Sequence, residues 1–138
     1  MLDNSQIMGV NAPKKHQRII GKLMMQLGIL FYIKKVLPFE PLPETMIDES
    51  RTSPTPDILL FDSERKQNMA IIEVSGNTGA KRDFEKVKEL IEEYEILEGF
   101  VYNYDTGVWR KYRFGIGEDL EQPTYSEVAN QDLDELLK

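Results

Sequence analysis

The stretch TPDILLFDSERKQNMAIIEVS, residues 55–75, decides the fold of this chain. It contains two short apolar runs, at residues 58–61 and 70–74, on either side of a polar turn. Short runs rich in strand-forming residues around such a turn are typical of two adjacent antiparallel strands. Because neither run alternates with polar residues over its length, both strands are expected to be covered on both faces of a sheet.

Amphipathic helices are predicted before and after this strand pair. Apolar residues at spacings of one, three and four predict helices over residues 16–31 and 84–97, and Gly99 is expected to end the second one. Between the first helix and the strand pair, residues 36–56 hold five of the seven prolines. Proline cannot donate to a ladder of hydrogen bonds, so this stretch predicts loops and edge structure, with a short strand at 44–48.

The rest of the chain completes the sheet. Residues 100–104 and 108–114 predict a hairpin around the turn at 105–107, and a last short helix is predicted over residues 130–137. A strand, a helix and a strand in succession form a βαβ unit, whose two strands are parallel and whose crossover is right-handed. We therefore expect one α/β domain over residues 1–138, with a central mixed β-sheet flanked by helices and one βαβ crossover.

Composition excludes several classes of protein. A chain of 138 residues with 41% apolar residues can bury one real core, which excludes a disordered or staple-dependent chain. The absence of cysteine excludes disulfides, thiolate metal sites and cysteine nucleophiles. The longest apolar stretch, residues 19–33, is interrupted by Lys22 and Gln26 and is too short to span a membrane. With no secretory signal at its start, the chain is expected to be cytoplasmic.

The net charge of −7 arises mainly at the end of the chain. From Glu118 onward there are seven acids and one base, which leaves 16 bases and 17 acids in residues 1–117. This near-neutral body contains basic clusters at residues 14–18, 81–88 and 110–113. Such clusters permit a phosphate-binding surface, although charged runs are more often ordinary solvated faces.

Nucleic-acid contacts are predicted from bases in two of these clusters, namely Lys81, Arg82, Arg110 and Arg113. In the second of them the aromatic residues Trp109 and Tyr112 alternate with arginines, an arrangement that can stack on bases and clamp a nucleic acid. Packing within the predicted hairpin is the more ordinary explanation of the same pattern.

Two acidic residues stand out by their position in the predicted strands. Asp57 begins the first strand directly after Pro56, and Glu73 lies inside the second strand. A buried ionised carboxylate costs several kcal/mol unless it is paired or bound to a cation. Facing residues of neighbouring strands lie ~5 Å apart, so these two carboxylates can converge. Paired carboxylates suit Mg²⁺ or Mn²⁺, which also take water and phosphate oxygens.

Each acid also has a structural interpretation. Asp57 fits a turn residue after proline, and Glu73 fits a strand-edge acid paired with a lysine. The single histidine, His16, opens the first predicted helix and is expected at the surface, so no Ser–His–acid triad can be assembled.

The order of the segments along the chain resembles a known superfamily. The segments are HQRIIGKLMMQL, TPDILLFD, IIEVS, RDFEKVKELIEEY, GFVYNYDTGVWRKY and YSEVANQDLDELL. This order is similar to that of the PD-(D/E)XK, or restriction endonuclease-like, nucleases. It is closest to their branch of small, uncharacterised bacterial proteins assigned to the restriction endonucleases. The likeness covers most of the chain.

This resemblance implies a metal-dependent endonuclease that hydrolyses phosphodiester bonds of DNA. Asp57 and Glu73 would be the catalytic acids that hold Mg²⁺ or Mn²⁺, which polarises the phosphate and lowers the pKa of an attacking water. A lysine would help to position that water and neutralise developing charge. Glu44 is a candidate third acid, and a homodimer is expected by analogy.

The chain departs from the motif at residue 75, where Ser75 stands in place of the expected lysine. Related branches carry this lysine on the following helix, where Lys86 and Lys88 are the candidates. Both lie about 100° from the centre of the apolar stripe, on opposite flanks, so the angle does not choose between them. Asp83 lies about 40° from that centre, and Lys86 falls on its flank, which favours Lys86 as the third catalytic residue. Both lysines also fit a solvated face, and Asp83 fits an acid that complements the helix dipole.

The missing lysine leaves a second interpretation open. The chain could be a catalytically inactive nuclease fold that binds nucleic acid or acts as a regulatory module. A third interpretation is an oligomeric protein of unrelated function that shares only the sheet.

Overall fold

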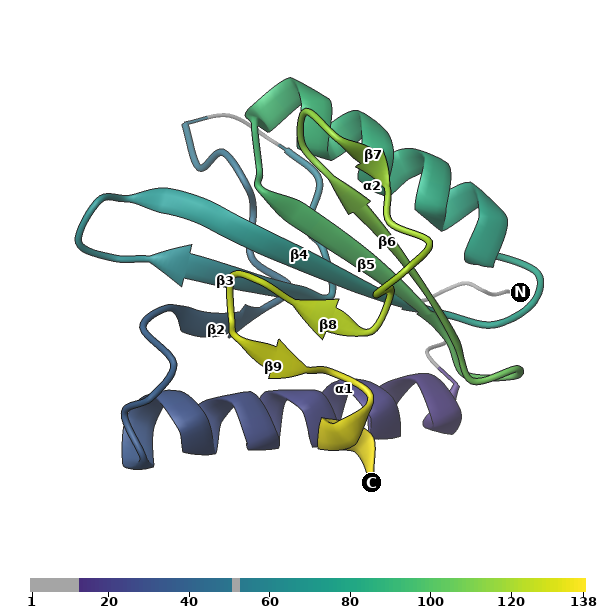
Figure 1. Ribbon diagram of the computed structural model, residues 1–138, viewed down its shortest axis with the longest axis horizontal. Coiled ribbons are helices and arrows are strands. Elements are labelled where there is room, and N and C mark those ends of the chain that lie inside the picture. Colours follow the sequence, from purple (N-terminus) through teal and green to yellow (C-terminus); the bar gives the residue numbers. More distant parts are fainter. Residues whose placement is uncertain (1–12, 51–52) are drawn as a thin grey trace, which may run out of the picture.

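The predicted strand pair lies at the centre of a six-stranded mixed sheet in the computed structural model, which describes residues 13–50 and 53–138. The strand order is β2-β3-β4-β5-β6-β7, and β8 and β9 form a separate small sheet (Figure 1). In chain order the elements are α1 Lys14–Gly28, η1 Ile29–Ile33, β2 Glu40–Pro43, β3 Ile58–Asp62, β4 Gln67–Ser75, α2 Ala80–Tyr94, β5 Glu98–Asn103, β6 Val108–Arg113, β7 Gly117–Glu118, β8 Tyr125–Ser126, β9 Gln131–Asp132 and η2 Glu135–Leu137.

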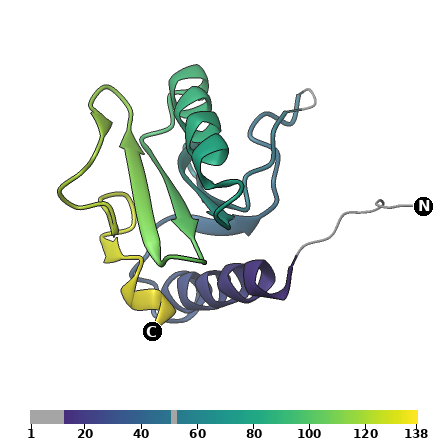
Figure 2. The ribbon, with the colours of Figure 1, turned by 90° about the vertical axis from the view of Figure 1, so that its right-hand side faces the viewer.

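The two long helices cover opposite faces of this sheet (Figure 2). On one face Leu23 and Leu27 of α1 pack in a buried core that includes Ile72 of β4. On the other face Val87 of α2 packs in a second core that includes Ile71 of the same strand. Successive residues of a strand point to opposite faces, so β4 contributes to both cores and is covered on both sides. The predicted α/β fold class, a mixed sheet flanked by helices, is confirmed.

The strand pairing follows the prediction. β3 and β4 are antiparallel, while β4 and β5 are parallel and are connected through α2. β5 and β6 form the predicted antiparallel hairpin. Gly107 in its turn has a φ of 74°, a conformation that glycine adopts without steric cost.

The first helix begins at Lys14, directly after Pro13, and its predicted last turn is a π-helical segment, η1. Proline is well tolerated at the start of a helix because the first backbone N–H groups have no partner within the helix. Within the described part of the chain, no helix combines the length and the apolar character needed to cross a membrane.

The second helix ends earlier than predicted, and Gly99 does not end it. α2 ends at Tyr94, followed by Glu95 in the left-handed conformation with a φ of 54°. Gly99 lies inside β5, where an added Cβ atom would come within 2.6 Å of Val87 Cγ1 and 2.7 Å of Ile91 Cδ1. The glycine is therefore explained by close packing of α2 on the sheet.

The predicted strand at residues 44–48 is wrong, because the strand in this region is β2, Glu40–Pro43. β2 contains Pro41 and Pro43 and pairs only with β3, at the edge of the sheet. An edge strand tolerates proline because one of its sides needs no backbone donors. Glu44 then leaves the strand with a φ of 45°.

The predicted helix at residues 130–137 is also wrong, since the chain forms β9 and a single 3-10 turn, η2. The local polar groups explain the difference. Asn130 has a φ of 54°, and the Asp132 carboxylate accepts a hydrogen bond from the backbone N–H of Asp134 at 3.0 Å. The Asp134 carboxylate in turn accepts a hydrogen bond from Trp109 Nε1 at 3.0 Å. Such side-chain interactions compete with the hydrogen bonds of a helix.

The contact at Gly99 yields a prediction about stability. Gly99→Ala is expected to lower the free energy of unfolding by about 1–3 kcal/mol, because the methyl group overpacks the core between α2 and β5. Gly21→Ala is the matched control, since Gly21 is exposed in α1 with no heavy atom near its Cβ position. It is expected to raise stability by about 0.5–1 kcal/mol. Urea unfolding of both variants checks this, and an unchanged midpoint for Gly99→Ala would contradict the packing argument.

Candidate active site

Asp57 and Glu73 come together where β3 begins and β4 nears its end. The antiparallel register pairs Ile58 with Ile72, so continuing it by one pair puts Asp57 opposite Glu73. The two carboxyl groups are hydrogen-bonded to each other. Asp57 Oδ2 also accepts a hydrogen bond from the backbone N–H of Val74 at 2.8 Å, which fixes its orientation.

The acid pair lies on the face of the sheet that α2 covers. Ile71 packs with α2, and Glu73 and Ser75 follow it at intervals of two along β4, so all three share this face. The Ser75 hydroxyl donates a short hydrogen bond to Asp83 Oδ2 in the first turn of α2. This contact ties the start of α2 to the strand that carries Glu73.

Burial and mutual repulsion control the ionisation of the pair. The Glu73 side chain belongs to a residue that is only 7% exposed, and loss of hydration together with the negative charge of Asp57 raises the pKa of Glu73 to about 9. Asp83 adds to this increase of the pKa, while the positive charge of Lys86 opposes it. At neutral pH Glu73 therefore keeps its proton.

The two candidate lysines of α2 differ in their partners. Lys86 is exposed and acts electrostatically on Glu73. Lys88 forms an ion pair with Glu85 at 3.1 Å and lies 5.7 Å from the centre of the Phe84 ring. Of the two, Lys86 is the lysine whose charge reaches the acid pair.

Glu44 is connected to the pair through its backbone. Its N–H donates to the carbonyl oxygen of Asp57 at 3.1 Å, and its side chain is exposed at the end of β2. This contact places the chain of Glu44 next to Asp57.

His16 belongs to this site, contrary to its expected surface role. Its Nε2 atom lies 3.4 Å from Asp57 Oδ2, and its side chain is only 21% exposed. The signal for this position was present in the sequence. His16 precedes Ile19 and Leu23 at helical spacing, so it continues the stripe of α1 that faces the sheet.

A loop and a hairpin turn support the site from one side. The Asp105 carboxylate accepts a hydrogen bond from the backbone N–H of Asn77 at 2.9 Å and lies 3.7 Å from Lys15 Nζ. The Tyr104 ring contacts His16 edge-on, with 6.5 Å between the ring centres. The β5–β6 turn thus connects the loop after β4 with the first turn of α1.

The four basic residues proposed for nucleic-acid contact are spread over the molecule. Lys81 and Arg82 are exposed in the first turn of α2, beside Asp83. The Arg110 guanidinium donates two hydrogen bonds to Glu118, at 2.9 and 2.8 Å, and lies 3.9 Å from the centre of the Phe84 ring. Arg113 lies at the opposite end of the sheet, 3.8 Å from Glu127. Only the first two stand beside the acid pair with their charges turned to solvent.

The donor set fits a magnesium or manganese ion that keeps part of its water shell. In residues 13–50 and 53–138 no group of three or more His, Asp or Glu side chains is arranged to hold a metal. Mg²⁺ is usually held by one or two carboxylates together with waters and substrate phosphates. Asp57 and Glu73 supply two carboxyl groups, and the raised pKa of Glu73 reflects excess negative charge that a cation would neutralise.

The raised pKa of Glu73 yields a prediction about pH. The folded protein keeps a proton on Glu73 between the ordinary pKa of 4.5 and about 9, whereas the unfolded chain does not. The stabilising contribution is therefore complete below the lower value and is lost as pH rises through the upper one. Glu73→Gln keeps a neutral donor, so its stability relative to the parent is expected to rise by up to ~1.4 kcal/mol per pH unit across this window.

Urea unfolding in EDTA at about pH 5.5 and about pH 8 measures this difference. Glu89→Gln, on the exposed face of α2, is the matched control and should follow the parent at both values. Parallel stability curves for Glu73→Gln and the parent would show that no proton is held there.

Comparisons with known proteins support the fold. No family model matches the chain, and no curated protein sequence matches it. A solved structure from Anabaena variabilis, named a "putative nuclease" of the DUF820 family, superposes with a TM-score of 0.72 and 14% sequence identity. The match covers 94% of this chain and 84% of that one. At this identity the likeness shows a shared α/β fold, in which the mixed sheet lies between helices.

Proposed function

We propose that this protein is a metal-dependent endonuclease that hydrolyses phosphodiester bonds of DNA, with Mg²⁺ or Mn²⁺ as its cofactor. The observation that carries the proposal is the meeting of two carboxyl groups from neighbouring strands, the buried Glu73 and the partly buried Asp57. Buried acids with a perturbed pKa are typical of functional sites. The fold shared with a DUF820 protein named as a nuclease points in the same direction.

In this proposal each group around the pair has a role. Asp57 and Glu73 hold the cation, which supplies Lewis-acid activation of the phosphate and of a water. Val74 N–H and His16 hold the Asp57 carboxylate in place, from the strand and from α1 respectively. Lys86 neutralises negative charge that develops on the phosphate, because its ammonium group is the one whose field reaches Glu73.

Ser75 does not take the place of the lysine expected at its position. Its hydroxyl is committed to Asp83, so its role is to fix the start of α2 against β4. A lysine supplied from α2 is consistent with this arrangement, because the contact holds the helix that carries Lys86 close to Glu73.

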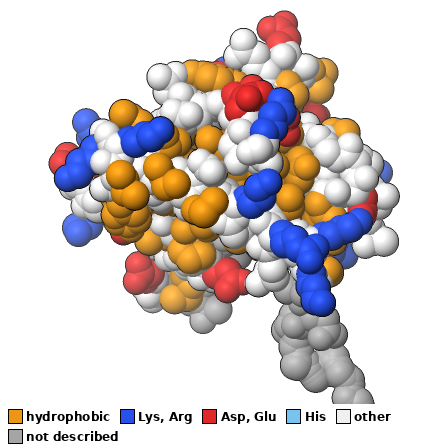
Figure 3. All heavy atoms as spheres, turned by 90° about the horizontal axis from the view of Figure 1, so that it is seen from below, with side chains coloured by type: hydrophobic (Ala, Val, Ile, Leu, Met, Phe, Trp, Pro, Cys, Tyr) orange, Lys and Arg blue, Asp and Glu red, His pale blue; other side chains and the backbone are white. Residues whose placement is uncertain are grey.

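DNA would approach over the exposed basic residues at the starts of the two long helices. Lys81 and Arg82 begin α2, and Lys14, Lys15 and Arg18 begin α1, whose first turn contacts Asp57 through His16. The space-filling view from below shows Lys and Arg side chains gathered beside the N-terminal end of α1 (Figure 3). Positive charge on both sides of the acid pair suits a phosphate backbone laid across it.

A catalytically inactive module that binds nucleic acid is the second candidate. Ser75 in place of the motif lysine and the exposure of Lys86 to solvent favour it. Both candidates require DNA binding, and they differ only in cleavage.

Cleavage separates the two candidates. The parent is expected to cut plasmid DNA with Mg²⁺ or Mn²⁺ and to stop in EDTA, while Asp57→Asn and Glu73→Gln should each lose at least about 100-fold in rate. Lys86→Ala should fall further than Lys88→Ala, and Glu89→Gln should match the parent. Gel-based cleavage assays measure these rates. Asp57 and Glu73 variants as active as the parent would rule out this site, and a parent inactive with both metals would favour the binding module.

DNA binding without turnover tests the basic surface. In EDTA, the double variant Lys81→Ala/Arg82→Ala is expected to bind a DNA duplex more weakly and to reduce the slope of log affinity against log salt by about 1.8, for two lost phosphate contacts. Arg113→Ala, at the opposite end of the sheet, should keep the parental slope. Fluorescence anisotropy across a salt series gives these values. An unchanged slope for the double variant, or a reduced slope for Arg113→Ala, would show that DNA binds to another face of the protein.

A further inference from the structure

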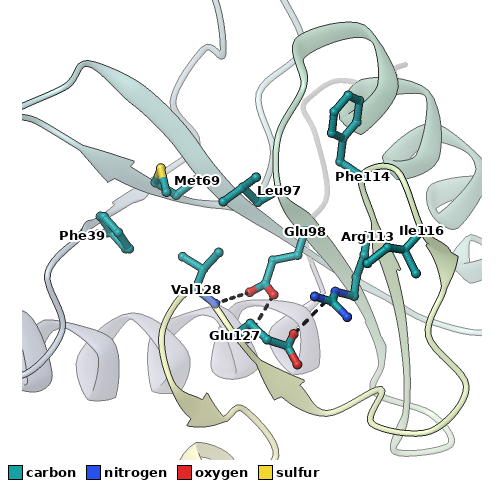
Figure 4. A pocket seen from close by; sticks show the side chains of 9 residues that line it. All are labelled: Phe39, Met69, Leu97, Glu98, Arg113, Phe114, Ile116, Glu127 and Val128. Atoms are coloured by element: carbon teal, nitrogen blue, oxygen red, sulfur yellow. Dashed lines mark hydrogen bonds and ion pairs between the residues drawn. The ribbon is translucent and has the colours of Figure 1, made fainter.

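The end of the sheet opposite the acid pair contains an open, mainly apolar pocket of about 380 Å³ (Figure 4). Phe39, Met69 and Leu97 contribute to its apolar wall, and Val128 lies across from them. Glu73 is four residues beyond Met69 along β4, or about 13 Å at ~3.3 Å per residue. The pocket is therefore separate from the candidate active site, and its role is independent of the proposed nuclease activity.

The most exposed apolar side chains at this pocket stand on its rim. Ile116 is 67% exposed and Leu97 is 50% exposed. Both line the pocket together with Phe114, which is also exposed. A small molecule inside the pocket would leave this rim in water, whereas a protein surface laid over it would cover the rim and the pocket together. Exposed apolar groups gathered in this way are typical of a protein–protein interface.

The same surface carries both a projecting group and a recess. The turn between β6 and β7 contains Gly115 and Gly117, with φ values of 76° and 112°, and holds Ile116 out between them. The recess lies directly beside this turn. In a two-fold interface each copy presents the same patch, so a patch that contains both parts can be complementary to itself.

The charges on the rim are also self-complementary. Arg113 Nε lies 3.8 Å from Glu127 Oε1, beyond hydrogen-bond distance, and both side chains face the pocket (Figure 4). One positive and one negative group side by side let two copies of a chain with a net charge of −7 meet without local repulsion. Two-fold pairing also brings the arginine of one copy toward the glutamate of the other.

Buried hydrogen bonds hold the floor of the pocket in one shape. The Glu98 carboxylate accepts hydrogen bonds from the Ser126 hydroxyl and from the backbone N–H groups of Glu127 and Val128. Lys111, which is fully buried, donates to the Tyr125 carbonyl and to the Glu127 carboxylate. Preformed surfaces of this kind bind a partner with little rearrangement.

We propose that this face is the two-fold interface of a homodimer, in which the Ile116 turn of each copy enters the pocket beside Leu97 of the other copy. The two acid pairs then lie at the far ends of the dimer and stay open to solvent.

Sedimentation equilibrium of the full chain tests this interface. The parent is expected to be a dimer at about 10–100 μM, and Ile116→Asp should raise the dissociation constant at least about 30-fold, as for a central interface residue. Leu120→Asp is the matched control, because Leu120 is 80% exposed and lies outside the pocket. It should remain a dimer. Since Ile116 is exposed, circular dichroism should show an unchanged fold for its variant.

A parent that stays monomeric up to about 100 μM would overturn the proposal, and so would a dimer that Ile116→Asp leaves unchanged. Cross-linking tests the assigned contact directly, because the chain has no cysteine of its own. An equimolar mixture of Ile116→Cys and Val128→Cys chains should form a mixed disulfide dimer under mild oxidation, at a yield above that of Leu120→Cys mixed with Val128→Cys. Equal yields would assign the dimer to another face.

Discussion

The rest of this structure depends on one constraint, which is that two carboxyl groups lie close together where water has little access. Asp57 and Glu73 meet because β3 and β4 are antiparallel and in the register that sets them opposite each other. Loss of hydration and the negative charge of Asp57 raise the pKa of Glu73 to about 9, so Glu73 keeps its proton at neutral pH. The backbone N–H of Val74 donates to Asp57, His16 Nε2 lies 3.4 Å from the same carboxyl group, and the positive charge of Lys86 opposes the rise in the pKa of Glu73. An arrangement of this kind costs folding free energy, and the cation proposed for this site would offset that cost when bound.

The crossover helix is the element that turns this pair into a site. α2 packs closely on β5 because Gly99 has no side chain, and its first turn is tied to β4 by Ser75 and Asp83. Lys86 lies one helical turn beyond Asp83, so the same tether sets the position of the lysine. Ser75 thus has a structural role, and the positive charge near the acid pair comes from Lys86 on α2, the helix that Ser75 holds in place.

The sequence predicted those helices, strands and turns that are determined by residues close together in the chain. The two apolar runs, the crossover helix and the hairpin turn at Gly107 each have a periodicity or a turn residue that identifies them, and the parallel pairing of β4 and β5 follows from their order. Glu95, Asn130 and Asp134 show where this reasoning fails. A non-glycine residue in the left-handed conformation ends α2, and side-chain hydrogen bonds replace the last predicted helix. These outcomes depend on single backbone conformations and side-chain hydrogen bonds, one of them from the distant Trp109, which periodicity does not encode.

The residues of the candidate site also differ in whether the local sequence identifies them. Asp57 and Glu73 could be chosen from the sequence because each carboxyl group is out of place in an apolar strand. His16 could not be chosen by that rule, because a polar residue in the first turn of a helix is common. Its importance depends on where the helix begins relative to the strand ends. Once α1 is aligned with β3 and β4, the stripe through Leu23 and Leu27 leads back to His16 and onto Asp57. The stripe in the sequence therefore places His16 on the side of α1 that faces the sheet, but its contact with Asp57 becomes visible only when the packing of the helix is known.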